Sequence, residues 1–355
     1  MSKPSTMRAI TISAWAKPPT LITVAMPEPP ASKSGSTQVK VLVSSLPQLV
    51  RSQISGTHYS VQDVPLPYIP GIEAAGFTPE GKLVYANLMA NKPQGGGFAE
   101  YVNVADRALT PIPVPEGADE QATKNLATKV SALFNPAMSS WMAMKYRARV
   151  DDFKAEGRAF SVLVVGVTST SGRIAALFAR HLGAKSIIGA ARNGEQLEKM
   201  KRSGTIDEAI TLNNSNISQT DFSVLSKSFE LYPLVVLDYV YGSTATALFN
   251  ALPRSAMQSE DLEVRYVHIG ALGRDMKTPV DGTLLRSKNV SISGAGPGSW
   301  STKALAKETP ELIQAIVNVI PAEGWRQEYG VVERSLEQFD EAWADTRGRT
   351  TFVVQ

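Results

Sequence analysis

The sequence contains no cysteine among its 355 residues. Disulfides, thiolate metal sites and cysteine nucleophiles are therefore excluded. Because a chain without cysteine suits any redox setting, this absence leaves the compartment undecided. Histidine is almost as scarce: the chain has His58, His181 and His268, whose spacing is not that of metal ligands. We therefore expect no metal site.

Long apolar runs and strong charge are missing as well. No run approaches the roughly 18 apolar residues of a membrane span, and the opening segment MSKPSTMRAI is no apolar signal. The formal net charge is only +3, without a long basic run, which gives little support to a nucleic-acid partner. The sequence thus predicts a cytoplasmic globular protein that binds neither membrane nor nucleic acid.

The most informative stretch that is present begins at Ser161. Residues Ser161–Val165 form a short β-branched apolar run, typical of a strand buried on both faces of a parallel sheet. A turn of small residues follows over Gly166–Gly172, then a helical apolar pattern that ends before Gly183, then a second buried strand, Ser186–Ala191. Such a βαβ unit of about thirty residues presents backbone N–H groups and a helix N-terminus to an anion such as a pyrophosphate.

The residues around this turn indicate which dinucleotide would bind. We expect the backbone and hydroxyl groups of five consecutive residues to hold the pyrophosphate: Thr168, Ser169, Thr170, Ser171 and Gly172. Arg192 and Asn193 follow the second strand, where an acid would bind a ribose 2′-hydroxyl. An arginine there suits a 2′-phosphate, which predicts NADP(H) rather than NAD(H). The alternative is a βαβ unit without a nucleotide, with a plain tight turn and a solvated Arg192.

The length of the chain predicts two domains. Up to about Gly117, short strands separated by proline and glycine suggest a barrel-like domain. The predicted strands there are Met7–Ile12, Leu21–Val24, Gln38–Ser44, Leu83–Ala86 and Phe98–Val102. A helical pattern follows over Asp119–Phe134, and we expect Pro136 to interrupt it before it resumes over Ser140–Tyr146.

Strands and helices alternate beyond Ser161, which predicts an α/β doubly wound parallel sheet. The further strand candidates are Glu208–Leu212, Leu234–Leu237, Arg265–Ile269 and Val290–Ser293, and the helix candidates are Gly172–Leu182, Glu195–Arg202 and Ser243–Leu252. After Pro310 we expect a helix over Glu311–Ile320, a second helix opened by a capping box of Ser335 and Gln338, and a last strand, Thr350–Val354.

Seven segments, in this order, carry a resemblance to a known family. They are PGIEAAG (70–76), GGFAEYV (96–102), NPAMSSW (135–141), VVGVTSTSG (164–172), LDYVYG (237–242), VHIGALG (267–273), and LRS with GAGPGS (285–299). The chain resembles the zinc-independent, quinone oxidoreductase-like branch of the medium-chain dehydrogenase/reductase superfamily.

The resemblance implies a GroES-like β-barrel catalytic domain made of residues 1–134 and 300–355. A Rossmann NADP-binding domain, residues 135–299, would be inserted in it, with the active site in the cleft between the domains. It also implies a possible homodimer formed through the sheet edge at Val290–Ser293.

Departures from the zinc-containing relatives bear on the reaction. Ile72 stands in PGIEAAG where those relatives carry a catalytic histidine. Without a metal to polarise an unactivated carbonyl, the acceptor should be a small electron-poor molecule, such as a quinone or a C=C bond conjugated to a carbonyl. The resemblance therefore implies an NADPH-dependent hydride transfer. Two alternatives remain: an enoyl reductase of a biosynthetic pathway, and a non-catalytic NADPH-binding redox sensor or structural protein.

The resemblance also suggests catalytic residues, each with a plainer interpretation. Tyr59 matches a tyrosine facing the substrate, where its phenol would stabilise an enolate or quinol anion, although it fits a loop aromatic packed on the barrel equally well. Arg286 would counter developing negative charge, or form an ordinary inter-domain ion pair. Ser139 matches a position near the nicotinamide but is also a possible helix cap. Glu73 matches a structural glutamate.

The remaining expected coenzyme contacts lie where predicted strands end, since ligands of open α/β sheets gather at the carboxyl ends of the strands. They are Tyr241, His268, Ile269, Gly270 and Gly296. His268 lies inside an apolar strand and is better explained as a structural histidine than as an acid. Gly296 is equally explained as a simple turn.

Overall fold

The computed structural model describes residues 5–56, 61, 64–91, 95–225, 232–252, 263–273, 275–346 and 348–354. The chain divides into two compact units. One contains residues 1–135 and 309–355, and the other contains residues 136–308. Both boundaries fall inside helices, in α2 (Glu120–Met142) and in α9 (Thr302–Val319).

The first unit is built on an antiparallel hairpin and a larger sheet. β1 (Thr6–Thr11) pairs with β2 (Thr20–Ala25). The seven-stranded sheet has the order β14-β15-β3-β4-β5-β7, with β6 also paired to β3. Its strands are β3 (Ser36–Ser45), β4 (Glu73–Phe77), β5 (Leu83–Asn87), β6 (Tyr101–Ala105), β7 (Leu109–Pro111), β14 (Val331–Ser335) and β15 (Arg349–Val353). Short helices α1 (Gln48–Ile54), α10 (Trp325–Glu328) and α11 (Phe339–Ala344) accompany it.

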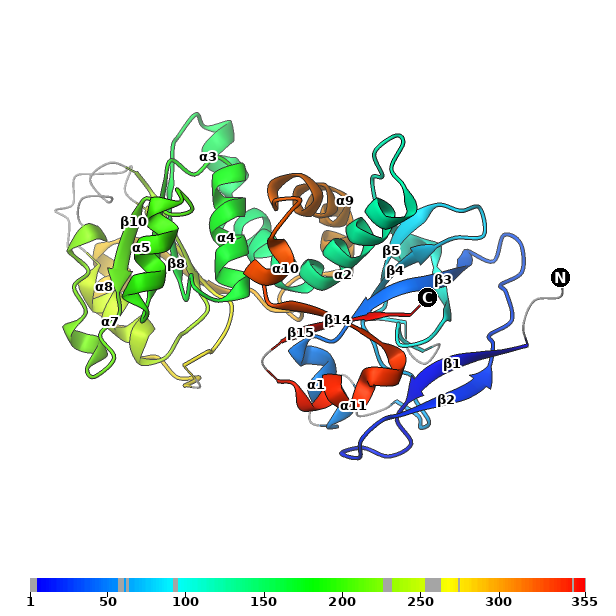
Figure 1. The fold of residues 1–355 in the computed structure, drawn as a ribbon. Coiled ribbons are helices and arrows are strands. Elements are labelled where there is room, and N and C mark those ends of the chain that lie inside the picture. The colour runs from blue at the N-terminus through cyan, green and yellow to red at the C-terminus, as the bar shows by residue number, and fades with distance from the viewer. Residues whose placement is uncertain are drawn as a thin grey trace. The chain divides into compact units, whose positions relative to one another are not determined.

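The return segment is part of this sheet. β15 pairs antiparallel with β3, with Thr351 opposite Ser45, so that the red C-terminal strand lies beside the blue β3 in Figure 1. Before α11, the predicted capping box is confirmed, because the backbone N–H of Ser335 donates to Gln338 Oε1 at 3.1 Å. This last part of the chain therefore completes a sheet begun some three hundred residues earlier, a separation that makes the pairing strongly non-local.

The second unit confirms the predicted α/β fold with a parallel sheet. Its six strands have the order β10-β9-β8-β11-β12-β13, and every pairing is parallel. They are β8 (Ser161–Val165), β9 (Ser186–Ala191), β10 (Glu208–Thr211), β11 (Leu234–Asp238), β12 (Glu263–His268) and β13 (Asn289–Gly294). The helices are α3 (Val150–Ala155), α4 (Thr170–His181), α5 (Gly194–Arg202), α7 (Ser243–Ala251) and α8 (Gly282–Ser287).

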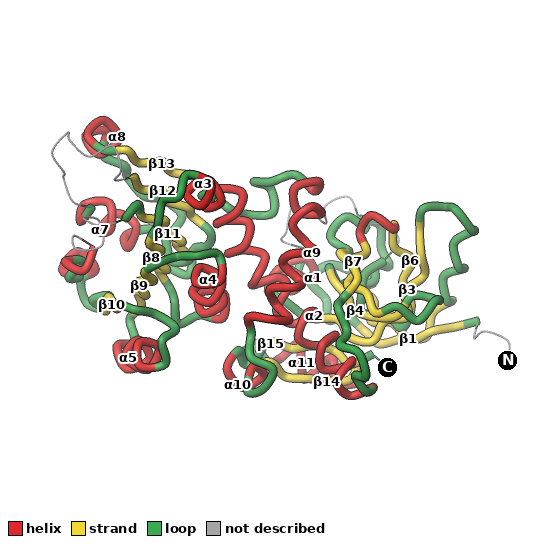
Figure 2. Tube along the Cα trace, turned by 90° about the horizontal axis from the view of Figure 1, so that it is seen from above, coloured by secondary structure: helices red, strands yellow, loops and turns green. Residues whose placement is uncertain are grey.

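Helices cover both faces of the parallel sheet, as Figure 2 shows for α4 on one side and α7 on the other. Leu163 and Val165 of β8 pack in one core with Leu248 of α7. Val162 and Val164 alternate with them and are also fully buried, which is why β8 reads as an uninterrupted apolar run. A sheet buried on both faces leaves its carboxyl edge as the place for polar side chains.

Two helix boundaries predicted from proline are wrong. α2 runs through Pro136, and α9 begins at Thr302 and runs through Pro310. A proline costs its helix one backbone hydrogen bond, but the neighbouring side chains are buried: Leu133 and Trp141 in α2, Leu312 in α9. Packing therefore holds each helix together despite the proline.

One predicted strand is displaced, and one observed strand has no sequence signal. β6 spans Tyr101–Ala105 rather than Phe98–Val102, because the backbone of Phe98 bonds Pro70 and Ile10 outside that ladder. β4, EAAGF, lacks the β-branched residues that mark strands. It forms because Gly76 lets β3 approach: a Cβ there would lie 2.2 Å from the carbonyl oxygen of Lys40. Within the described ranges, no helix has the length and apolar character that crossing a bilayer requires.

Candidate functional site

A large cavity lies in the second unit, at the carboxyl edge of the parallel sheet. Its volume is about 660 Å³. It is lined by the segments after β8, β9, β10, β11 and β12, through Gly166, Thr168, Ser169, Ala191, Arg192, Leu212, Asn213, Asn214, Ile217, Val240, Ser243, Thr244, Leu272 and Gly273. β8 and β11 are neighbours here while their helices α4 and α7 leave to opposite faces, so this is the switch point where open α/β sheets bind ligands.

The turn after β8 is shaped by its two glycines. Gly166 has a φ of +89°, a left-handed conformation that suits glycine. A Cβ on Gly172 would lie 2.3 Å from the carbonyl oxygen of Gly166, so α4 can approach β8 only because this residue lacks a side chain. Ser169 caps α4: its hydroxyl accepts the Gly172 N–H at 3.1 Å and donates to the Gly166 carbonyl at 2.8 Å.

Two helices begin at this cavity. Within the described part of the chain, no acceptor bonds the backbone N–H groups of Thr170 and Ser171, the first two of α4. Ser243 and Thr244, which line the cavity, open α7. The partial positive charges of both helix N-termini therefore face the same space, which favours an anion there. The predicted roles of Ser169 and Gly172 change accordingly: both already bond each other and shape the turn.

Arg192 lines the cavity directly after β9 and is exposed. Among the described residues, none forms a hydrogen bond or an ion pair with its side chain. Asn193 beside it caps α5 by accepting the Gln196 N–H at 3.0 Å. The sequence analysis missed Arg173 in the first turn of α4, whose Nε donates to the Thr168 carbonyl at 3.1 Å and whose Nη2 donates to Gln196 at 3.4 Å. The sequence did offer a signal for Arg173, because the helix dipole disfavours a cation in the first turn of a helix.

Asp238, at the end of β11, organises the next two loops and was also missed. It is fully buried, and its Oδ1 accepts the N–H groups of Val240 at 2.8 Å and Tyr241 at 3.0 Å. The Tyr266 hydroxyl donates to Oδ2. Burial raises the pKa of Asp238, while these three hydrogen bonds oppose the rise. A carboxylate closing an apolar strand was the available signal.

Tyr241 and His268 are brought together beside this carboxylate. Their rings stack with centroids 3.9 Å apart at 29°. Tyr241 has a φ of +62°, which is unusual for a residue with a side chain. Burial lowers the pKa of His268, and the nearby Asp238 partly counters this. The N–H groups of Ile269 and Gly270, expected to meet the coenzyme, donate instead to the Asp238 carbonyl at 2.8 and 3.2 Å.

Ser139 lies close to the same edge of the sheet. Its hydroxyl donates to the Pro136 carbonyl at 2.7 Å and lies 3.3 Å from the hydroxyl of Tyr239, the residue after Asp238. Ser139 is inside α2 rather than at its N-terminus, so it is no helix cap.

Gly296 follows β13 and forms a turn closed by Ser299, whose hydroxyl accepts the Gly296 N–H at 2.9 Å. Neither Ser139 nor Gly296 lines the cavity.

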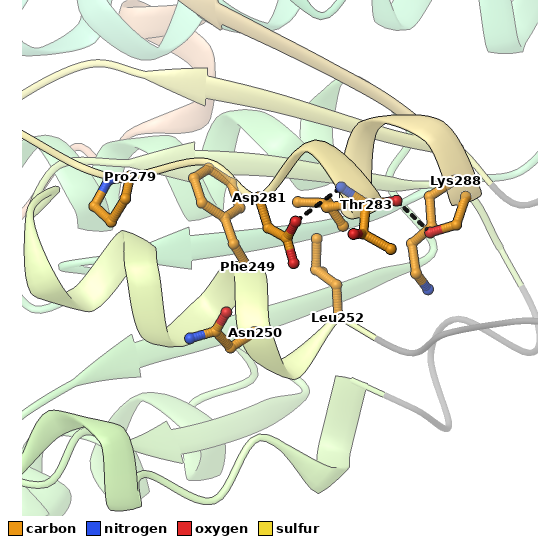
Figure 3. Close-up of a pocket in the computed structure, with 9 residues that line it drawn as sticks. Phe249, Asn250, Leu252, Pro279, Asp281, Thr283 and Lys288 are labelled. Carbon is orange, nitrogen blue, oxygen red and sulfur yellow. Dashed lines mark hydrogen bonds between the residues drawn. The ribbon is translucent and has the colours of Figure 1, made fainter.

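Arg286 lies elsewhere. It is exposed on α8, just before β13, and therefore at the amino end of that strand, opposite the edge with the cavity. The structure does not bring it to the predicted coenzyme contacts. A small cavity of about 30 Å³ beside α8 has room for about one water molecule. Figure 3 shows its Asp281, which caps α8 by accepting the Thr283 N–H at 2.8 Å. Tyr59 lies outside the described residues.

The first unit holds a buried acid that the sequence analysis assigned no chemistry. Glu73, in β4, accepts hydrogen bonds from the hydroxyls of Ser45 and Tyr85, the latter at 3.1 Å. Burial raises its pKa to about 7, against these hydrogen bonds and the charge of Arg349. Over the ranges that the structure describes, no group of three His, Cys, Asp or Glu side chains could hold a metal ion.

Comparisons with known proteins agree with this architecture. No family model matches the chain. A protein of Emericella nidulans named probable NADPH-dependent quinone reductase tdiC is 29% identical, over 98% of this chain and 100% of its own length. The quinone oxidoreductase of Thermus thermophilus, solved also as a complex with NADPH, has a TM-score of 0.61 at 21% identity, covering 98% of this chain and 100% of its own.

A second solved structure, the yhdH oxidoreductase of Salmonella enterica in complex with NADP, has a TM-score of 0.64 at 17% identity, covering 98% of this chain and 100% of its own. At such low identity the solved structures show the shared fold. The likeness covers 98% of this chain in each of the three comparisons. Over nearly its whole length, the chain is therefore similar in sequence to a protein named as a quinone reductase and shares the fold of solved oxidoreductases.

Proposed function

We propose that the protein is an NADPH-dependent, metal-free reductase that transfers a hydride to a quinone or to a C=C bond conjugated to a carbonyl. One observation carries the proposal: an exposed arginine without a protein partner among the described residues follows β9 at the rim of a cavity that two helix N-termini face. The names of the relatives, among them an NADPH-dependent quinone reductase, support the same reaction.

The residues of the cavity fit the coenzyme. Its volume of about 660 Å³ lies within the usual range of roughly 300–1,000 Å³ for cofactor sites. The N–H groups of Thr170 and Ser171 would hold the pyrophosphate, where a side chain on Gly172 would displace α4. Arg192, with Asn193 beside it, would contact the 2′-phosphate. The coenzyme, when bound, supplies the hydride.

The protein itself supplies binding and orientation. Ser139, Tyr241 and His268 lie beyond the turn, on the side of β11 and β12, and we propose that they flank the nicotinamide half together with Ile269 and Gly270. An electron-poor acceptor needs no metal, and Ile72, which is buried, has no ligand atom. Water can protonate the product anion once the hydride has been transferred. Tyr59 stays the predicted donor to the acceptor oxygen.

We also propose a GroES-like catalytic domain of residues 1–134 and 300–355 with a Rossmann domain of residues 135–299 inserted, although residues 300–308 pack in the second unit. The pairing of β15 with β3 supports this division. A homodimer formed through β13 is proposed on the position of that strand at the sheet edge, where Ile292 is 40% exposed.

Replacing Arg192 by alanine tests the coenzyme assignment. Removing a charged hydrogen-bond partner of the 2′-phosphate should raise the Kd for NADPH about 10- to 100-fold and leave the Kd for NADH nearly unchanged. Both constants are measured from the fluorescence of the reduced nucleotide. The control is Arg202→Ala, which removes the same charge from the exposed end of α5.

Equal losses for both nucleotides in Arg192→Ala would refute the 2′-phosphate role. Turnover is followed as loss of NADPH absorbance with a panel of quinones and enones. Binding of NADPH without turnover of any acceptor would favour a non-catalytic NADPH-binding protein, and oxidation of a saturated alcohol would refute the metal-free argument.

A further inference from the structure

The loops after β11 and β12 are joined around Asp238. The backbone carbonyl of Asp238 accepts the backbone N–H groups of Ile269 and Gly270. Next along the loops, the Leu272 N–H donates to the Tyr239 carbonyl at 2.9 Å, and the Gly273 N–H to the Val240 carbonyl at 3.0 Å. Leu272, Gly273 and Val240 line the cavity. Asp238 lies behind the cavity wall and fixes its shape without being part of the lining.

Tyr241 is held in an unfavourable backbone conformation at this point. The left-handed region disfavours residues with a Cβ, and a glycine at position 241 would adopt a φ of +62° without strain. The Asp238 carboxylate accepts the N–H groups of both Val240 and Tyr241, which holds this turn in place. Strained residues of this kind cluster at ligand sites, because the surrounding structure must maintain them. The strain therefore suggests that the tyrosine ring itself is needed.

The order of the strands gives the position of this ring along the expected coenzyme. Neighbouring strands are about 4.8 Å apart. Arg192 follows β9, the pyrophosphate turn follows β8, and Asp238 and His268 end β11 and β12. The two halves of a dinucleotide extend in opposite directions from its pyrophosphate. With the adenosine phosphate at β9, the other half extends along β11 and β12, where the Tyr241 and His268 rings stack.

We propose that Asp238 is a positioning residue, which holds Tyr241 in its strained conformation and so fixes the Tyr241–His268 ring pair beside the nicotinamide half of the coenzyme. The inference rests on the proposed function and extends it to residues behind the cavity. If the proposal is right, disturbing Asp238 or the ring pair should weaken the binding of NADPH and of NADH equally. The reason is that the 2′-phosphate, by which the two nucleotides differ, would lie on the other side of the pyrophosphate turn.

The decisive variant is Tyr241→Gly, which removes the ring and relieves the backbone. Without nucleotide it should melt above Tyr241→Ala, which loses the same packed ring but keeps a Cβ in the left-handed region. Its Kd values for NADPH and NADH should both rise by the same factor, about 3- to 10-fold, as expected for losing an aromatic contact. Tyr241→Phe keeps the ring and should bind both nucleotides as the wild type does. The matched control is Lys33→Gly, which relieves the same left-handed backbone conformation in an exposed loop of the first unit. It should leave both Kd values unchanged.

The Asp238 variants test the link between carboxylate and ring. In Asp238→Asn, the amide oxygen can still accept the two N–H groups and the amide nitrogen can donate to Tyr266, so both Kd values should stay within about 2-fold of the wild type. Asp238→Ala should weaken both nucleotides about as much as Tyr241→Gly does.

Two outcomes would overturn the proposal. One is wild-type affinity for both nucleotides in Tyr241→Gly, and the other is a loss confined to NADPH in either Tyr241→Gly or Asp238→Ala. Both presuppose that the wild-type protein binds NADPH. A wild-type protein that binds neither nucleotide would instead refute the proposed function.

Discussion

Replacing Gly172 by alanine puts a single methyl group where α4 closely approaches the end of β8, in the proposed coenzyme site. The new Cβ would lie 2.3 Å from the Gly166 carbonyl oxygen and 2.7 Å from Val167 Cα, against 3.4 Å for ordinary contact. Both neighbours are backbone atoms of a buried turn, so α4 must retreat by about 1 Å to restore normal contact. Overpacking of this kind costs about 1–3 kcal/mol of unfolding free energy.

The same displacement moves the N–H groups of Thr170 and Ser171 away from a bound pyrophosphate. Hydrogen bonds to a charged group contribute about 1.5–3 kcal/mol each, so we expect a lower urea midpoint and a Kd for NADPH raised by about 10-fold or more. The matched control is Gly194→Ala, also in the first turn of a helix, where the added Cβ meets nothing closer than 3.4 Å. A Gly172→Ala protein as stable as the control, with wild-type NADPH affinity, would show that the contact between α4 and β8 was misjudged.

Two further predictions concern the first unit and the sheet edge. Burial raises the pKa of Glu73 from 4.5 to about 7 in the folded protein. The unfolded chain therefore releases this proton at a lower pH than the folded protein does, and the free energy of unfolding falls as pH rises through this range. Between pH 5 and 8 the loss is about 2–3 kcal/mol, and Glu73→Gln should abolish it in urea titrations at several pH values; an unchanged pH slope would contradict the assignment. Ile292→Lys should convert the proposed dimer to a monomer, as measured by light scattering. A wild-type protein that is itself monomeric would exclude the dimer.

The central βαβ unit was predictable almost to the residue. β8 and β9 begin and end where the sequence analysis places them, because strands buried on both faces are marked by uninterrupted apolar runs. The turn between them was predictable because small residues are required there. Arg192 lines the cavity, as the position after β9 suggested, although its contact with a phosphate stays a prediction.

Residues whose roles depend on distant partners were not predictable. Asp238 has its partners in the loop after it and in β12, and nothing in its neighbours along the chain announces the Tyr266 hydroxyl. At Pro136 a local signal was misleading: proline usually interrupts a helix, but the buried packing around Trp141 keeps α2 continuous through it. Ser169 and Gly172 were correctly located in the turn, but their mutual hydrogen bond could be seen only in three dimensions.

The pairing of β15 with β3 has a consequence for synthesis. Residues 136–308 form a continuous stretch and can fold as soon as they have left the ribosome, whereas β3 lacks this neighbour until residues 349–353 are made. During that interval the nascent chain carries an open hydrogen-bonding edge, the kind of surface on which strands of other molecules add. Truncation near the C-terminus should therefore cause aggregation through the first 135 residues while residues 136–308 acquire their native form.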